Sequence, residues 1–436
     1  MDIKINFSKT IGKIKPMHAV GQPPFSGTSF DMFKYLTDAG IPYSRLHDVG
    51  GAYGGGRWVD IPNIFRDFDA DETLPDSYDF AFTDLLINAL VEAGVEPFFR
   101  LGVTIENAAK IKSYRISPPK DFAKWARICE HIIRHYTEGW ADGFYHKITY
   151  WEIWNEPDNF ENPEDNQMWS GTPEEYYELY SVTAKHLKGC FPHLKIGGYA
   201  SCGFYDIIEQ AKPVAEAKST PRLRYFIDFF DGFIAYIKKS GAPLDFFSWH
   251  SYDTAKENIL YARYARERLD AAGFTSTETT CNEWNARPTE KGTFRHAALT
   301  SAVMLAFQNT PLDSAMFYDA RCGIGNYSGM FNPETRKPRP AYYSFIAFNE
   351  LYELGEQAEL SSEFKEGVYA VAARNEKRGA LVIANTSGED LPISITADGA
   401  KLFECRITTE GECDRRCLMP GVLKNDSTLT VRFELK

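Results

Sequence analysis

The sequence predicts an α/β fold, a (β/α)8 TIM barrel with a C-terminal accessory β-sandwich domain. Short apolar or β-branched runs alternate eight times with stretches of helical periodicity, which is typical of parallel strands covered by outer helices. Eight strand–helix pairs favour a closed barrel over an open doubly wound sheet. The helical periodicity stops after Gly355, and the residues that follow alternate as strands do.

The barrel strands are expected at eight short runs. They are His18–Val20, Ser44–His47, Glu96–Leu101, Tyr150–Trp154, Lys195–Gly198, Phe246–His250, Thr277–Glu283 and Ser314–Tyr318. The helices are expected at Ser29–Ala39, Tyr78–Ala93, Asp121–Tyr136, Thr172–Lys188, Arg222–Lys239, Ala255–Ala272, Phe294–Gln308 and Ala341–Leu354. Gly94 stands at a C-cap position, and Thr172 with Pro173 gives the fourth helix an N-cap and a first-turn proline.

The β-domain is expected from β-branched and alternating runs near the C-terminus. They are Val368–Ala373, Ala380–Ala384, Leu391–Thr396, Phe403–Thr408 and Thr428–Phe433. Asp2–Phe7 also alternates and is expected to add a strand to this domain. The predicted boundaries are therefore 1–16 for the N-terminal strand that joins the β-domain, 17–354 for the barrel and 355–436 for the β-domain. No Pro- or Ser-rich linker separates the two units, so they are expected to pack together.

The net charge argues against some classes of binding partner. There are 48 Lys and Arg against 60 Asp and Glu, a net charge of −12, and no basic run, which argues against nucleic acid or an anionic membrane as a partner. No run of about 18 apolar residues could span a bilayer. The chain opens on Met1-Asp2-Ile3-Lys4 without an apolar leader, so a cytoplasmic location is expected. The eight cysteines contain no C-x-x-C pair, which predicts reduced thiols rather than a zinc site.

A glycine-rich stretch, Gly50–Arg57, follows the second strand. It lacks the Lys-Ser/Thr of a phosphate-binding loop, and no helix begins directly behind it. This stretch is therefore predicted to be a flexible loop at the barrel mouth.

Two strand ends carry the candidate chemistry. The segment Trp151–Asp158 ends the fourth strand and Thr280–Asn285 ends the seventh, and the carboxyl ends of barrel strands form the active-site face. Pro157 cannot continue a strand, so Glu156 is expected where the chain turns outward. Glu156 and Glu283 would then face one cavity from two walls, the arrangement that glycosidic bond cleavage needs.

Two other carboxylates compete with this pair. Glu152 shares the strand face of Glu156 but lies about 13 Å further down an extended strand. Glu278 begins its strand, at the opposite end of the barrel. Both positions favour Glu156 and Glu283.

Asn155-Glu156-Pro157 followed by Glu283 is similar to the pattern of clan A glycoside hydrolases. The longer match resembles glycoside hydrolase family 39, which contains β-xylosidases and α-L-iduronidases. It rests on Trp151–Asp158, Trp169–Thr172 with Tyr176 to Tyr180, Trp249–Tyr252, Lys337–Tyr343 and the trailing β-domain. The resemblance implies a retaining enzyme with a carbohydrate substrate and with neither a metal nor an organic cofactor.

The resemblance also implies a role for each matching residue. Glu156 would be the general acid/base, and Glu283 the nucleophile of a double displacement. Asn155 would hold the hydroxyl next to the anomeric carbon, while Tyr252 would orient Glu283 and help to keep it ionised. Tyr252 is also implied to bind the sugar, together with His47, His250 and Asp319.

Some of these positions have plain structural alternatives. His47 could be a structural histidine bonded to backbone, and Asp319 could simply pair with Arg321. Trp284 is expected to bind substrate, as one of four tryptophans placed to form walls for the sugar, the others being Trp151, Trp154 and Trp249.

Three functions follow. The leading one is a retaining glycosidase that releases a non-reducing-end sugar, most similar to a β-xylosidase. The second is an α-L-iduronidase-like or other specificity of the same family; a carboxylated sugar needs a cation, for which Arg45, Arg57, Arg100 and Arg321 are candidates. The third is an inactive carbohydrate-binding barrel, against which the presence of both Glu156 and Glu283 argues.

Overall fold

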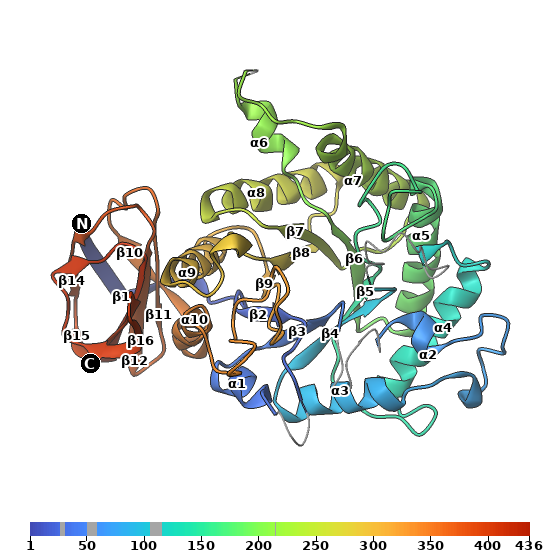
Figure 1. Cartoon of the computed structure of the whole chain (residues 1–436), viewed down its shortest axis with the longest axis horizontal. Coiled ribbons are helices and arrows are strands. Elements are labelled where there is room, and N and C mark those ends of the chain that lie inside the picture. Colours follow the sequence, from blue (N-terminus) through green and yellow to red (C-terminus); the bar gives the residue numbers. More distant parts are fainter. Residues whose placement is uncertain (27–30, 50–58, 105–115, 214) are drawn as a thin grey trace.

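The computed structural model describes residues 1–26, 31–49, 59–104, 116–213 and 215–436. Its larger part is a closed parallel barrel, which confirms the predicted TIM barrel (Figure 1). The barrel strands are β2 (Ala19–Gly21), β3 (Tyr43–Leu46), β4 (Glu96–Leu101), β5 (Tyr150–Ile153), β6 (Lys195–Ser201), β7 (Phe246–Ser251), β8 (Glu278–Trp284) and β9 (Ser314–Phe317). Closure comes from β2, which pairs in parallel with both β3 and β9.

Helices surround the barrel (Figure 1). The long ones are α3 (Ala81–Glu92), α4 (Phe122–Thr137), α5 (Pro173–Cys190), α7 (Pro221–Ser240), α8 (Ala255–Ala272), α9 (Phe294–Gln308) and α10 (Tyr342–Leu354), with the shorter α1 (Phe33–Asp38), α2 (Ile61–Ile64) and α6 (Asp206–Ala211). The predicted N-cap is present: Thr172 and Glu175 form a reciprocal capping box at the start of α5. None of the described helices is both long and apolar enough to cross a membrane.

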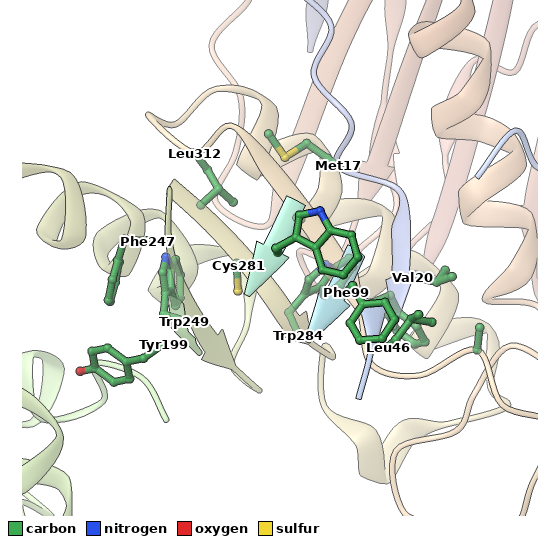
Figure 2. Packing of buried hydrophobic residues seen from close by; sticks show 14 of the residues in the cluster. Met17, Val20, Leu46, Phe99, Tyr199, Phe247, Trp249, Cys281, Trp284 and Leu312 are labelled. Atoms are coloured by element: carbon green, nitrogen blue, oxygen red, sulfur yellow. The ribbon is translucent and has the colours of Figure 1, made fainter. Parts of the chain in front are cut away.

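The strands sort their side chains into two layers. Inside the amino-terminal end of the barrel, Phe98, Phe246 and Met316 pack with Ala19 as an apolar floor. The alternate residues face the helices: Phe99 packs on α4, Phe247 on α7 and Trp249 on α8, and Figure 2 labels all three among the buried hydrophobic residues. The polar residues of the strands therefore lie above the apolar floor, toward the carboxyl ends.

The β-domain is an eight-stranded sheet in the order β14-β1-β10-β11-β12-β18-β15-β16, which curls around its own core. Its strands are β1 (Asp2–Lys13), β10 (Glu356–Ser361), β11 (Val368–Arg374), β12 (Arg378–Asn385), β14 (Ser394–Ala397), β15 (Ala400–Thr409), β16 (Glu412–Cys417) and β18 (Ser427–Leu435). A separate two-stranded sheet joins β13 (Leu391–Pro392) to β17 (Val422–Leu423). The N-terminal strand β1 pairs with β10 and β14.

The β-domain packs on the barrel through α9 and α10. Arg432 of β18 forms an ion pair with Glu350 of α10, and Thr428 donates a hydrogen bond to Ser301 of α9. All eight cysteines are free thiols.

Candidate active site

Arg45 lies at the centre of the polar layer inside the barrel. Its side chain is 1% exposed. Its Nε donates to Glu152 Oε2 at 2.7 Å, its Nη2 to Asn155 Oδ1 at 2.5 Å, and its Nη1 to Glu283 Oε2 at 3.2 Å. One guanidinium from β3 therefore ties together the end of β5 and the end of β8.

Glu152 supports Arg45 from below. Its Oε1 accepts hydrogen bonds from Ser248 Oγ at 2.6 Å and from Asn282 Nδ2, and it is fully buried. Arg45, Ser248 and Asn282 all donate hydrogen bonds to the Glu152 carboxylate, as a negatively charged acceptor requires. Its negative charge balances the positive charge of Arg45.

The turn after β5 places Glu156 at the carboxyl end of the barrel. Trp154 and Glu156 have φ values of 73° and 43°, in the left-handed region that side chains other than glycine rarely adopt. The turn is held from outside: the Glu156 backbone N–H donates to the carbonyl of Ala200 on β6 at 3.0 Å. Strained backbone of this kind is commonly found where a functional side chain must be aimed.

A register shift between β7 and β8 directs the Glu283 carboxylate into the barrel. On β7 and β8, Trp249 pairs with Cys281 and His250 pairs with Glu283, so Asn282 is an extra residue on β8. This irregularity allows Asn282 and Glu283, although adjacent in sequence, both to contact groups inside the barrel.

His250 lies between the two carboxylates. Its Nδ1 is 2.8 Å from Glu156 Oε1, and its Nε2 is 3.7 Å from Glu283 Oε2. One oxygen of each carboxylate and one ring nitrogen of His250 lie within 4.8 Å of one another. Burial lowers the pKa of His250 to about 4, so the ring is neutral near pH 7 and its N–H can hydrogen bond to Glu156.

The two carboxyls share one electrostatic environment. Burial raises the pKa of Glu156 and that of Glu283, and the charge of Glu156 raises the pKa of Glu283 further. Arg45 and the hydroxyl of Tyr252, which donates to Glu283 Oε1, act in the opposite direction on Glu283. Two such close carboxyls favour a state with one shared proton. Glu283 contacts the Arg45 cation directly, whereas Glu156 contacts the neutral Asn159 amide and the neutral His250 ring, so the ionised form is favoured at Glu283 and the protonated form at Glu156.

Comparison with known proteins identifies the family. The model of glycosyl hydrolases family 39 matches residues 32–278, more than half of the chain. The chain belongs to glycosyl hydrolases family 39. It is therefore a glycoside hydrolase, and its substrate is a carbohydrate.

Several known proteins are similar to this chain in sequence or in fold. The chain is 26% identical to a β-xylosidase of Caldicellulosiruptor saccharolyticus over 442 aligned residues, covering 90% of this chain and 80% of that one. A glucosidase from Croceicoccus marinus superposes with a TM-score of 0.79 at 21% identity, covering 100% and 99% of the two chains. A monomeric β-xylosidase from Caulobacter crescentus gives 0.67 at 17% identity, again over 100% and 99%.

The remaining predicted residues of this family 39 chain fall into two groups. Asn155, His250 and Tyr252 contact the carboxylate pair or Arg45 as described above. His47 is buried beside Asp48, 3.3 Å from its Oδ1, and burial lowers its pKa. Asp319 is also buried and is engaged by Arg321 and Ser328, whose groups lie 2.9 and 3.1 Å from it. This is the ion pair that the sequence left open as the alternative.

The expected tryptophan walls are wrong. Trp284 directly follows Glu283 on β8, where it is paired with Ser251 of β7. Its side chain does not face the site: it is fully buried against Phe307 of α9 and Phe317 of β9. Figure 2 labels it among the buried hydrophobic residues of the barrel part. Trp151, Trp154 and Trp249 are likewise buried. Because at most 1% of the surface of each residue is exposed, none of the four offers a ring face on which a sugar could stack.

Other aromatic and polar groups reach the site that sequence reasoning did not select. The ring of Tyr327, 37% exposed, lies 4.7 Å from that of Tyr252 and offers the accessible surface that the tryptophans lack. Asn159 donates to Glu156 Oε2 at 2.9 Å. Nothing in the sequence marks Tyr327, whereas Asn159 stands three residues after Glu156 in the same turn.

The candidate arginines for a carboxylated sugar are largely engaged. Arg45 serves Glu152 and Glu283, Arg100 is buried with Asp60 at 2.6 Å, and Arg321 pairs with Asp319. Arg57 and the predicted Gly50–Gly56 loop lie outside the described residues.

Proposed function

We propose that the chain is a retaining exo-glycosidase of β-xylosidase-like specificity, with Glu156 as acid/base and Glu283 as nucleophile. The observation that carries the proposal is the carboxylate pair, with oxygens within 4.8 Å of each other. Retaining enzymes place the two carboxyl groups about 5–5.5 Å apart, whereas inverting enzymes need about 6.5–9.5 Å to admit a water molecule.

The residues around the two carboxylates account for both steps of a double displacement. In the first, Glu156 transfers its proton to the glycosidic oxygen as that bond breaks, and a Glu283 oxygen bonds to the anomeric carbon. In the second, Glu156 removes a proton from water, whose oxygen displaces Glu283 and restores its carboxylate. Arg45 and Tyr252 hold Glu283 ready for attack, and the Oδ1 bond to Arg45 turns the Asn155 amide donor toward the opposite side, where a sugar hydroxyl can accept it.

The specificity rests on two supports. The relative from Caldicellulosiruptor saccharolyticus is a β-xylosidase. In the described part of the barrel, Arg45, Arg100 and Arg321 are each paired with a carboxylate, which favours a neutral sugar over a uronic acid.

The test is a panel of aryl glycosides with matched variants. Wild type is expected to hydrolyse the β-xyloside best, and proton NMR is expected to show β-xylose as the first anomer formed. Glu283→Gln should abolish turnover, and azide should restore activity to Glu156→Ala as a β-glycosyl azide. A first product of α configuration would exclude retention, preference for a uronide would overturn the specificity, and inactivity on every sugar would favour the binding protein.

A further inference from the structure

Asp158 is a buried carboxyl immediately behind the acid/base turn. It is fully buried, and its Oδ2 accepts from Ser201 Oγ at 2.8 Å and from the Cys202 backbone N–H at 3.1 Å. No cation among the described side chains forms an ion pair with it. A buried carboxylate without a cation is costly to keep ionised, so its presence beside the proposed acid/base needs an explanation.

The first part of the explanation is mechanical. Asp158 bonds to the end of β6, next to Ala200, whose carbonyl accepts from the Glu156 backbone. The turn from β5 and the end of β6 both contain left-handed residues, with φ of 43° at Glu156 and 58° at Ala200. Two strained segments thus face each other, and the Asp158 contacts fasten one to the other.

The second part is electrostatic. Burial, together with the charge of Glu156, raises the pKa of Asp158 to about 7. The charged or titratable groups that interact electrostatically with Glu156 are His250, Glu283, Arg45, Arg222, Cys202, Asp158, Tyr205, Tyr252 and Tyr327. The charge of Asp158 contributes to raising the pKa of Tyr176, Tyr177, Tyr199 and Tyr225, which are its titratable neighbours together with Cys202. Of the two carboxylates near Glu156, Glu283 is needed as an anion, so Asp158 is the one free to change charge with pH.

We propose that Asp158 is a positioning residue that fastens the acid/base turn to β6 and whose negative charge keeps the proton on Glu156 as the pH rises. The proposal rests on the proposed role of Glu156. Loss of an ionised Asp158 removes repulsion from the Glu156 carboxylate, so Glu156 gives up its proton at a lower pH. The alkaline limb of kcat/KM reports this proton.

The experiment compares three variants by pH profiles of kcat/KM on an aryl β-xyloside. Asp158→Asn removes the charge and keeps the shape; its alkaline limb should move down by about one pH unit. Ser201→Ala keeps the Asp158 carboxyl but removes one contact that fastens the turn and that lowers the pKa of Asp158; its kcat should fall severalfold, and its alkaline limb should move less than that of Asp158→Asn. Asp313→Asn is the control, because Asp313 is a carboxyl with a raised pKa at the amino-terminal end of β9, away from the acid/base turn, and its limb should not move.

Each result decides one part. An unmoved limb in a folded Asp158→Asn protein overturns the electrostatic part, and wild-type kcat in Ser201→Ala overturns the mechanical part. If Asp158→Asn fails to fold, Asp158→Glu keeps the charge and should retain the wild-type limb; a limb shifted down would contradict the proposal. Should Glu156→Ala show no azide rescue, the acid/base assignment itself fails, independently of the Asp158 profile.

Discussion

Replacing Glu152 with Gln tests whether the buried ion pair organises the site. Glu152 is fully buried and receives only donors, from Arg45, Ser248 and Asn282. Glutamine has the same shape but no charge, and its amide NH2 must point at one of these donors. The substitution therefore leaves Arg45 without its nearest anion and creates a donor–donor contact beside it.

The expected cost follows from this burial. Removing one partner of a buried ion pair costs about 3–5 kcal/mol. Arg45 keeps Glu283 as a second anion at 3.2 Å, so the lower figure, about 3 kcal/mol, is expected. A shift of Arg45 toward Glu283 would also release Asn155, and misplacement of such groups by about 1 Å costs about a hundredfold in rate.

The assay is urea unfolding together with kcat/KM, with Glu278→Gln as the matched control. Glu278 also pairs with a cation and a tyrosine, Lys195 and Tyr150, but its side chain is 30% exposed and lies at the far end of the barrel. A partly solvent-exposed pair such as this contributes about 0–1 kcal/mol. Equal unfolding free energies for the two variants, with kcat/KM of Glu152→Gln near wild type, would refute this reasoning.

Three further predictions concern individual groups. Tyr252→Phe removes a donor to Glu283, so we expect a loss of about 1.5–3 kcal/mol in transition-state stabilisation and an acidic limb of kcat/KM at higher pH; an unmoved limb would contradict this. Gly40→Ala and Gly94→Ala both place a side chain at positive φ, which costs about 1–2 kcal/mol in each variant. Only at Gly40 would the new methyl group collide with a neighbour, the side chain of Asn349, so Gly40→Ala should be the less stable variant. Equal urea midpoints for the two variants would disprove this steric contribution. Burial lowers the pKa of His18 from 6.5 to about 4, so its contribution to stability is present above pH 6.5 and is lost as the pH falls toward 4. The unfolding free energy of His18→Gln should therefore fall less between pH 6.5 and 4 than that of wild type. Parallel falls for the two proteins would refute this coupling of His18 protonation to stability.

Local patterns predicted much of the fold because the relevant signals are short-range. The barrel strands are short, mostly buried runs between helical stretches, and each was placed within a few residues. β10 and β16 were missed because Glu356–Ser361 and Glu412–Cys417 are too polar to alternate clearly. The predicted strand Leu391–Thr396 is two strands in different sheets, β13 and β14.

The site was predictable only in part. Position at a strand end selected Glu156 and Glu283, but Trp284 was chosen for its closeness in sequence, and alternation on the strand sends it to the outer layer. The extra residue on β8 that brings both Asn282 and Glu283 inside is invisible in a single sequence. The role of Arg45 depends on three strands distant in sequence, which only closure of the barrel brings together.

The most direct test of the central claim is mass spectrometry of the enzyme after reaction with an activated 2-deoxy-2-fluoro-β-xyloside, which slows hydrolysis of a glycosyl–enzyme. A retaining enzyme with Glu283 as nucleophile should gain one fluoro-sugar, on the peptide that contains Glu283, and Glu283→Gln should gain none. Attachment at another residue, or turnover of the reagent without any covalent adduct, would contradict the account.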